Sequence, residues 1–316
     1  MDAPRPGSLT RRALLGGSVA TIGGAAISTG CGLLPRESLR LSTAPLRLLG
    51  AAIEQAQQVL TTLRSGEHLA TLRNNHRDHL AALRRRIGEA TFSESNPTPS
   101  MSIGDLSAQL VNTEHALWET ARQRVLALPE LHDGLDTVRH TDQLSLLGSI
   151  AACQATHLVL LKVPVPEQAQ QPLTGSQRSV ETLQIVLANE HAVIYGYGAL
   201  GGRLHSDQRD QALTALERHR TRRDALGIAI NANGATPVQS APSYQLPRTI
   251  DTPEQARTLA ITLEENCAEH WRLALAGVGG RDRSVALAAL VDCATTATGW
   301  RLRNKDQPVT VPFPGT

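Results

Sequence analysis

Apolar and polar positions along the chain recur with the 3.6-residue period of an α-helix, and alternation of the strand type is rare. In one stretch, Leu183, Val186, Leu187, Ile194 and Tyr197 fall on a single face. Eight such stretches predict eight helices, separated by Gly- and Pro-rich breakers. Their predicted bounds are 45–64, 66–87, 105–127, 141–162, 179–203, 207–232, 253–276 and 283–302. The chain is therefore predicted to be all-α.

A Pro- and Gln-rich linker over 163–176 divides the predicted helices into two sets of four. In each set the connection between the second and third helices is long, about 88–104 and 231–252. One long connection that crosses the length of a bundle is the ferritin-like arrangement. The pattern predicts two ferritin-like antiparallel four-helix bundles in tandem, a degenerate one over 45–162 and a second over 177–303.

Four short matches occur in the same order in the two halves and indicate an internal duplication. They pair Glu54 with Glu190, His76 with His219, Glu114 with Glu264, and Cys153 with Cys293. The fourth helices differ, because Ala152 stands in the first half where the second half has Asp292.

The first 30 residues have the layout of an export signal. Arg11 and Arg12 precede a Gly-rich apolar run that is short of the roughly 20 residues needed to cross a bilayer, and the Arg pair predicts twin-arginine export. The sequence STGC, which ends at Cys31, resembles a bacterial lipobox and predicts a lipid such as palmitate on Cys31. A cleaved signal without lipid and an uncleaved anchor are the alternatives.

A lipid on Cys31 would hold the protein on the outer face of the cytoplasmic membrane, with a tether over 31–44 and a flexible tail over 304–316. The bilayer is then one partner, and an envelope protein or a second copy of the chain is another candidate. Without residues 1–30, which contain three Arg and one Asp, the formal charge falls from +2 to 0. A neutral mature protein gives no electrostatic reason to bind nucleic acid.

Charged side chains fall on the predicted inward faces of the second half. Glu190 is in phase with Leu187 and Ile194, and burial of a carboxylate costs several kcal/mol unless it is paired or binds a metal. The inward faces of the next three helices offer candidate partners, namely His219, Arg223, Glu264 and Asp292.

These residues predict either a buried polar network or a site for iron or another divalent metal. Di-iron bundles take a Glu from each of two helices and a Glu-x-x-His from each of the other two. No inward Glu-x-x-His occurs in these helices, so we favour the polar network. Cys267 and Cys293 form either a disulfide or two buried thiols, and Gly196 and Gly198 predict close helix approaches.

The second half resembles an uncharacterised ferritin-like family of exported actinobacterial proteins. Three stretches carry the resemblance, which covers about 176–303: ANEHAVIYGYGALGGRL (188–204), HRTRRDAL (219–226) with the later GATP, and LEENCAEHWRLAL (263–275). The resemblance implies a fold and no particular reaction. No catalytic triad order, P-loop or dinucleotide fingerprint occurs, and no catalytic residue is predicted. We expect a membrane-anchored interaction or ligand-binding scaffold, with a metal-dependent oxidoreductase or metal-handling protein as the alternative.

Overall fold

The computed structural model describes residues 43–63, 66–88, 92, 103–129, 137–166, 171–246 and 250–316, and those ranges contain helices and no strand. The predicted all-α fold is confirmed. The helices are α1 (Ala44–Thr62), α2 (Leu69–Ile87), α3 (Ile103–Leu126), α4 (Thr137–Leu160), α5 (Val180–Leu200), η2 (a 3₁₀ turn, Gly201–Arg203), α6 (Ser206–Ala232), α7 (Pro253–Gly277) and α8 (Gly280–Asn304).

Local sequence signals explain where some helices begin. At the start of α7 the Thr252 side chain accepts a hydrogen bond from the Gln255 backbone N–H at 3.2 Å. The Gln255 side chain accepts one from the Thr252 N–H at 3.1 Å, and Pro253 occupies the first helical position. This capping box satisfies backbone donors that a helix start otherwise leaves unpaired. The sequence TPEQ predicts it.

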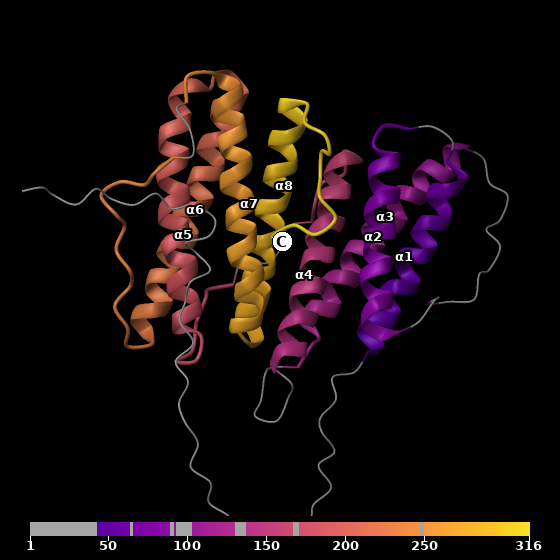
Figure 1. Ribbon diagram of the computed structural model, residues 1–316, viewed down its shortest axis with the longest axis horizontal. Helices are drawn as coiled ribbons and strands as arrows, with labels where there is room; N and C mark the ends of the chain where they lie inside the picture. The colour runs from indigo at the N-terminus through magenta and orange to yellow at the C-terminus, as the bar shows by residue number, and fades with distance from the viewer. Residues whose placement is uncertain are drawn as a thin grey trace, which may run out of the picture.

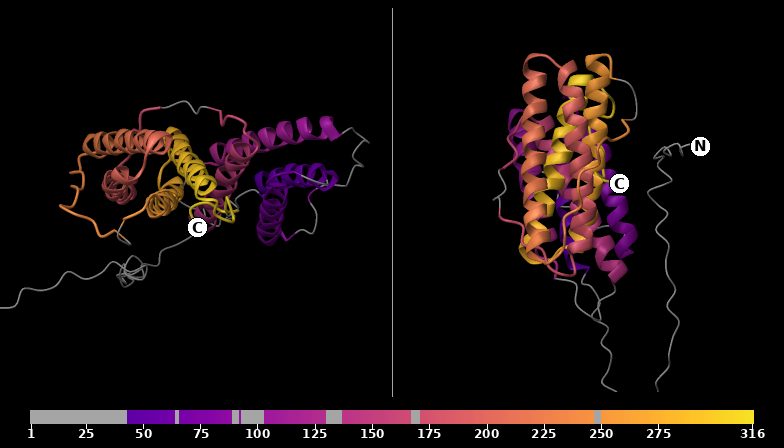
Figure 2. Two further views of the ribbon diagram at one scale, coloured as in Figure 1. Left: turned by 90° about the horizontal axis from the view of Figure 1, so that it is seen from above. Right: turned by 90° about the vertical axis from the view of Figure 1, so that its left-hand side faces the viewer.

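The contacts between helices follow the same pattern in the two halves. In the first half α1 packs on α2 and α3, and α3 packs on α4; in the second, α5 packs on α6 and α7, and α7 packs on α8. The halves meet where α4 packs against α7 and α8, in the middle of the molecule (Figure 1). Seen from above, α8 lies next to α4 (Figure 2, left).

The connection between α6 and α7 follows the length of α5. Gln184, near the start of α5, donates to the Thr236 carbonyl at 2.7 Å, and Arg203, just after its end, donates to the Ile250 carbonyl at 2.7 Å. Residues 247–249 lie outside the described part of this connection. Because the chain returns along α5 before α7 begins, α6 and α7 run in the same direction (Figure 1).

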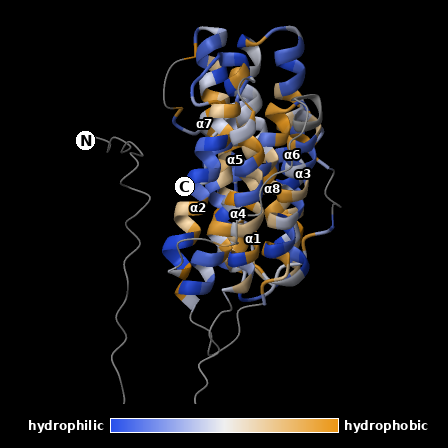
Figure 3. Cartoon of the chain, turned by 90° about the vertical axis from the view of Figure 1, so that its right-hand side faces the viewer, coloured by the Kyte–Doolittle hydropathy of each residue, from blue (hydrophilic) through white to orange (hydrophobic). Residues whose placement is uncertain are grey.

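The core lies between the helices, where apolar positions gather (Figure 3). Among the described residues, α4 alone is long and apolar enough to cross a membrane, and 89% of its apolar window is buried inside the protein. The apolar surface of α4 packs against α3 of the first half and against α7 and α8 of the second. Gly148 allows this contact, since a Cβ there would lie 2.3 Å from Leu275 Cδ1 of α7.

The C-terminal segment, predicted as a flexible tail over 304–316, packs against both halves. The Thr310 hydroxyl lies 2.6 Å from the hydroxyl of Thr156 on α4, and Arg272 of α7 donates to the Gly315 carbonyl at 2.5 Å. The segment has no helical period, and only the assembled helices provide the surface that it covers.

The predicted export signal cannot be compared with the structure. Arg11, Arg12, Cys31 and nearly all of the 31–44 tether lie outside the described residues, which begin at Thr43. Export and lipid attachment therefore stay predictions.

The two glycines of α5 differ in their surroundings. A Cβ on Gly196 would lie 2.6 Å from Leu263 Cδ1 of α7, so this glycine permits a close approach between the helices. A Cβ on Gly198 would meet nothing within 4 Å, so the predicted close approach there is wrong.

The glycine pair gives a matched stability test. We expect Gly198→Ala to raise the free energy of unfolding by about 0.5–1 kcal/mol, because alanine loses less backbone entropy in a helix. Gly196→Ala should lower it by about 1–3 kcal/mol through overpacking against Leu263. Urea denaturation of both variants measures the difference, and equal effects would contradict the close approach.

Candidate functional site: two buried polar clusters

A group of polar side chains is buried between the helices of the second half, and we call it the second-half cluster. In this cluster, Glu190 of α5 pairs with His219 of α6. Glu190 is completely buried, and its Oε2 accepts a hydrogen bond from His219 Nδ1 at 2.7 Å. Both side chains lie on the inward faces that their helical phase predicts. The predicted contact between Glu190 and a basic group of the next helix is therefore present.

The second ring nitrogen of His219 faces α7. Its Nε2 donates to Glu264 Oε1 at 3.3 Å, and the Tyr197 hydroxyl donates to the same oxygen in a short hydrogen bond. Trp300 of α8 in turn donates to the Tyr197 hydroxyl at 3.2 Å. Because carboxylates only accept hydrogen bonds, a ring that donates from both nitrogens is an imidazolium.

Two more residues of α7 complete the surroundings of Glu190. Trp271 Nε1 donates to Glu190 Oε1 at 2.8 Å, and the Cys267 thiol lies 3.4 Å from the same oxygen. Neither contact was predicted from the sequence. Their spacing from Glu264, at i+3 and i+7, was the signal, because it places all three on one helix face.

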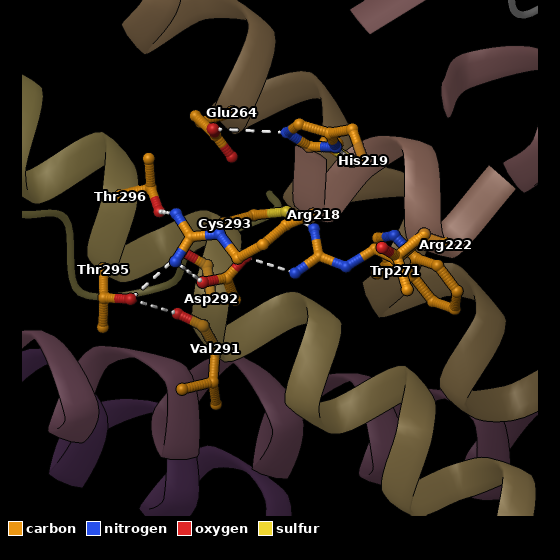
Figure 4. Close-up of polar contacts among 12 residues, drawn as sticks. Arg218, His219, Arg222, Glu264, Trp271, Val291, Asp292, Cys293, Thr295 and Thr296 are labelled. Atoms are coloured by element: carbon orange, nitrogen blue, oxygen red, sulfur yellow. Dashed lines mark hydrogen bonds and ion pairs between the residues drawn. The ribbon is translucent and has the colours of Figure 1, made fainter. Parts of the chain in front are cut away.

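Asp292 forms a neighbouring pair with α6 rather than joining Glu190. Its carboxylate accepts from Arg218 at 2.8 Å and from Arg222 in a short contact (Figure 4). Arg223, which we predicted in the network, instead pairs with the adjacent Asp224 at the surface, so that prediction was wrong. Arg222 and Arg223 both lie at the edge of the buried face of α6. Arg222 pairs with Asp292 because it lies on the side of α6 that adjoins this residue of α8.

The charges of this region balance one another. Three carboxylates (Glu190, Glu264 and Asp292) face three cations (Arg218, His219 and Arg222). Burial alone would lower the pKa of His219, but the charges of Glu264 and Glu190 outweigh it and raise the pKa to about 10. Burial alone would raise the pKa of Glu190, but the charge of His219 keeps this pKa below its usual range.

Glu190, His219 and Cys267 offer ligand atoms within 4.8 Å of one another, so a metal site must be considered. Ligands at 2.0–2.2 Å from one ion lie about 3.3–3.6 Å apart in a tetrahedral site. The Glu190–His219 distance of 2.7 Å is that of a hydrogen bond. Both ring nitrogens also face carboxylates at hydrogen-bond distance, so the arrangement of this cluster is that of a hydrogen-bonded network.

A second cluster lies between α2, α3 and α4 of the first half. Glu114 Oε2 lies 3.0 Å from His157 Nδ1, and Glu114 Oε1 lies 3.3 Å from His76 Nε2. All three side chains are fully buried. Burial opposes ionisation of Glu114, but the two histidines hold its pKa well below the usual range. Burial lowers the pKa of His157.

The first half departs from the predicted duplication at Glu54. This residue pairs with Arg84 at 2.8 Å, near the surface of α2, and does not reach the cluster. The third partner is His157 of α4, which the sequence analysis missed. It stands one turn after Cys153, so the Cys153–Cys293 match could have pointed to it. The second half has Ala297 at the equivalent position.

The three cysteines of the described chain, Cys153, Cys267 and Cys293, are buried free thiols. Of the two alternatives for Cys267 and Cys293, the structure therefore contains the thiols. Burial raises the pKa of Cys267 far above its usual value, so this thiol stays protonated and unreactive.

The fold and the clusters define an all-α protein with charged networks sealed between its helices. Residues 182–316, which include nearly all of α5 and the whole of α6 to α8, match the family described as a domain of unknown function, DUF4439. The chain therefore contains a DUF4439 domain, which confirms the recognition of an uncharacterised family domain in the second half.

The chain is also similar to the crystal structure of a conserved hypothetical protein from Mycobacterium tuberculosis. The two are 33% identical over 40% of this chain and 96% of that chain, with a TM-score of 0.39. Among curated proteins, none matches the chain.

Substitution of Glu190 tests the second-half network. Glu190→Ala leaves a buried imidazolium with one carboxylate and removes an acceptor of Trp271, so we expect a loss on the order of 3–5 kcal/mol in unfolding free energy. Glu190→Gln keeps an acceptor and should cost less. Urea denaturation gives both values. Glu54→Ala is the control: Glu54 is less completely buried than Glu190 and pairs with a partly exposed Arg84, so this change should cost less than Glu190→Ala.

The raised pKa of His219 predicts a pH dependence. The unfolded ring titrates near 6.5 and the folded ring near 10. Stabilisation by the imidazolium is therefore complete below about pH 6.5 and is lost as the pH rises toward 10. We expect wild-type unfolding free energy, measured between pH 6.5 and 9.5, to fall more steeply than that of His219→Gln. Parallel curves would mean that His219 is not protonated in the fold.

Proposed function

We propose that the protein is an exported lipoprotein, anchored to the outer face of the cytoplasmic membrane through Cys31. Its folded part consists of two ferritin-like four-helix bundles in tandem. The repeated helix contacts and the long connection along α5 support this architecture, because a ferritin-like bundle has one crossover between its second and third helices. The Arg11–Arg12 pair and the residues before Cys31 support the export route.

The role that the geometry favours is an interaction or ligand-binding scaffold of the cell envelope. One observation carries this proposal: the carboxylates of Glu190, Glu264 and Asp292 are each paired with basic side chains of the same domain. Such a network fixes the relative positions of α5, α6, α7 and α8. Groups already committed to one another are poorly placed to bind a substrate or to exchange protons with it.

A metal-dependent oxidoreductase or metal-handling protein is the second candidate. The ligand atoms of Glu190, His219 and Cys267 within 4.8 Å favour it. In that case Glu190→Gln and Glu190→Ala would both lose the metal of the second half and have a lower metal content than wild type, whereas the scaffold predicts equal metal content in wild type and both variants. Metal analysis of protein folded in its own host separates the two.

The anchor is tested by Cys31→Ala in a host that exports the protein. We expect the variant to leave the membrane fraction for the medium, or to accumulate as precursor, because the acyl chains supply the membrane affinity. Mass spectrometry of the wild-type N-terminus should find a lipid on Cys31. Replacement of Arg11 and Arg12 by Lys is the control for the export step and should retain precursor inside the cell. A mature terminus upstream of Cys31 without lipid would refute the anchor.

A further inference from the structure

The first-half cluster brings two imidazoles and one carboxylate together from three helices. His76, Glu114 and His157 each offer one ligand atom within 4.8 Å of the others, and none of them is exposed. Imidazole nitrogens with a carboxylate oxygen form the donor set of zinc sites and of mononuclear iron(II) sites.

The distances in this cluster are those of ligands around one ion. Glu114 Oε1 lies 3.3 Å from His76 Nε2, and Glu114 Oε2 lies 3.0 Å from His157 Nδ1, with which it shares a hydrogen bond in the absence of an ion. Ligands at 2.0–2.2 Å from an ion lie about 2.8–3.1 Å apart in octahedral coordination and about 3.3–3.6 Å apart in tetrahedral coordination. Small side-chain rotations would place the three donor atoms around a common centre.

His76 is the decisive residue, because its polar atoms are buried without partners. Neither of its ring nitrogens makes a hydrogen bond, and Glu114 Oε1, although within ion-pair distance, makes none either. A buried polar atom without a partner costs about 1–3 kcal/mol. The same pair of atoms in the second half, His219 Nε2 and Glu264 Oε1, is aligned as a hydrogen bond.

The buried carboxylate also lacks a strong counter-charge. In the part of the chain that the structure describes, no Arg or Lys lies within ion-pair distance of Glu114, whose basic neighbours there are His76 and His157. In the second half, Arg222 contributes positive charge near Glu190. A divalent cation would supply the positive charge that the first half lacks.

From the donor set, the distances and the unpartnered atoms, we propose that His76, Glu114 and His157 bind one divalent transition-metal ion, with zinc as the ion of choice. His76 would bind through Nε2, Glu114 through its carboxylate and His157 through Nδ1. The ion joins α2, α3 and α4. Because the ligands come from three helices and are sealed from solvent, metal binding adds directly to the stability of the fold.

The surroundings of His157 accommodate this ligation. Its Nε2 lies 3.1 Å from the amide nitrogen of Asn75. When Nδ1 binds the ion, the ring proton moves to Nε2, and the Asn75 amide, turned by 180°, presents its oxygen to that proton. Metal-binding histidines commonly donate their other N–H to such a fixed acceptor. The proposal does not depend on the scaffold role, because it concerns the half outside the family domain.

The test uses the untagged full chain, unfolded in urea with a chelator and refolded with zinc chloride. After gel filtration, elemental analysis of wild type should find about one zinc per chain, and zinc should raise the melting temperature. Glu114→Gln and His157→Asn should each reduce the zinc affinity at least about 100-fold, beyond the effect of second-shell changes. His219→Gln, in the second-half cluster, is the matched control and should retain wild-type zinc.

Wild type that retains no zinc would overturn the proposal, as would an equal loss of zinc in His219→Gln and His157→Asn. Circular dichroism first checks that each variant is helical. If a first-half variant does not fold, X-ray absorption of the wild-type zinc complex decides the question. A first shell with two imidazoles supports the site, and a shell without imidazole refutes it.

Discussion

A histidine buried against a glutamate, between the second and third helices, is the constraint common to both halves. His76 Nε2 lies 3.3 Å from Glu114 Oε1, and His219 Nε2 lies 3.3 Å from Glu264 Oε1. A lone charge in either position would destabilise the fold, because low-dielectric surroundings solvate it poorly. The other charged contacts in the two clusters reduce this destabilisation, because they place an opposite charge near the buried pair.

The two halves differ in the third residue that stabilises this buried histidine–glutamate pair. In the second half Glu190 enters from α5, and a network of four helices reaches electrical balance with Arg222, Arg218 and Asp292. In the first half Glu54 faces Arg84 near the surface, and His157 enters from α4 instead. The result is one closed ionic network and one cluster of donor atoms that is short of positive charge. The same arrangement of helix contacts therefore surrounds a different kind of polar cluster in each half.

The two halves are also physically interlocked. The Pro312 carbonyl lies 2.6 Å from the ring of His79, which stands one turn after His76 on α2. Burial lowers the pKa of His79 to about 3, so the ring is neutral and the carbonyl fixes its orientation. The C-terminal segment, which lies within the matched family domain, therefore supports the cluster of the other half. Through this contact and the α4 surface, the stability of each half depends on the other.

The sequence by itself determined the helices, their order, the long connections and the inward phase of Glu190, His219 and Glu264. Helical period and turn residues act over a few neighbouring positions, so they can be read without the fold. Only the tertiary structure decided that Arg222 rather than Arg223 contacts Asp292, that Glu54 pairs with Arg84 and that His157 completes the first cluster. Those outcomes depend on which side chains of neighbouring helices lie at the same level along the helix axes. Packing between residues that are distant in the sequence decides this alignment. The C-terminal segment shows the same limit, because its ordered position exists only where α2, α4 and α7 have already come together.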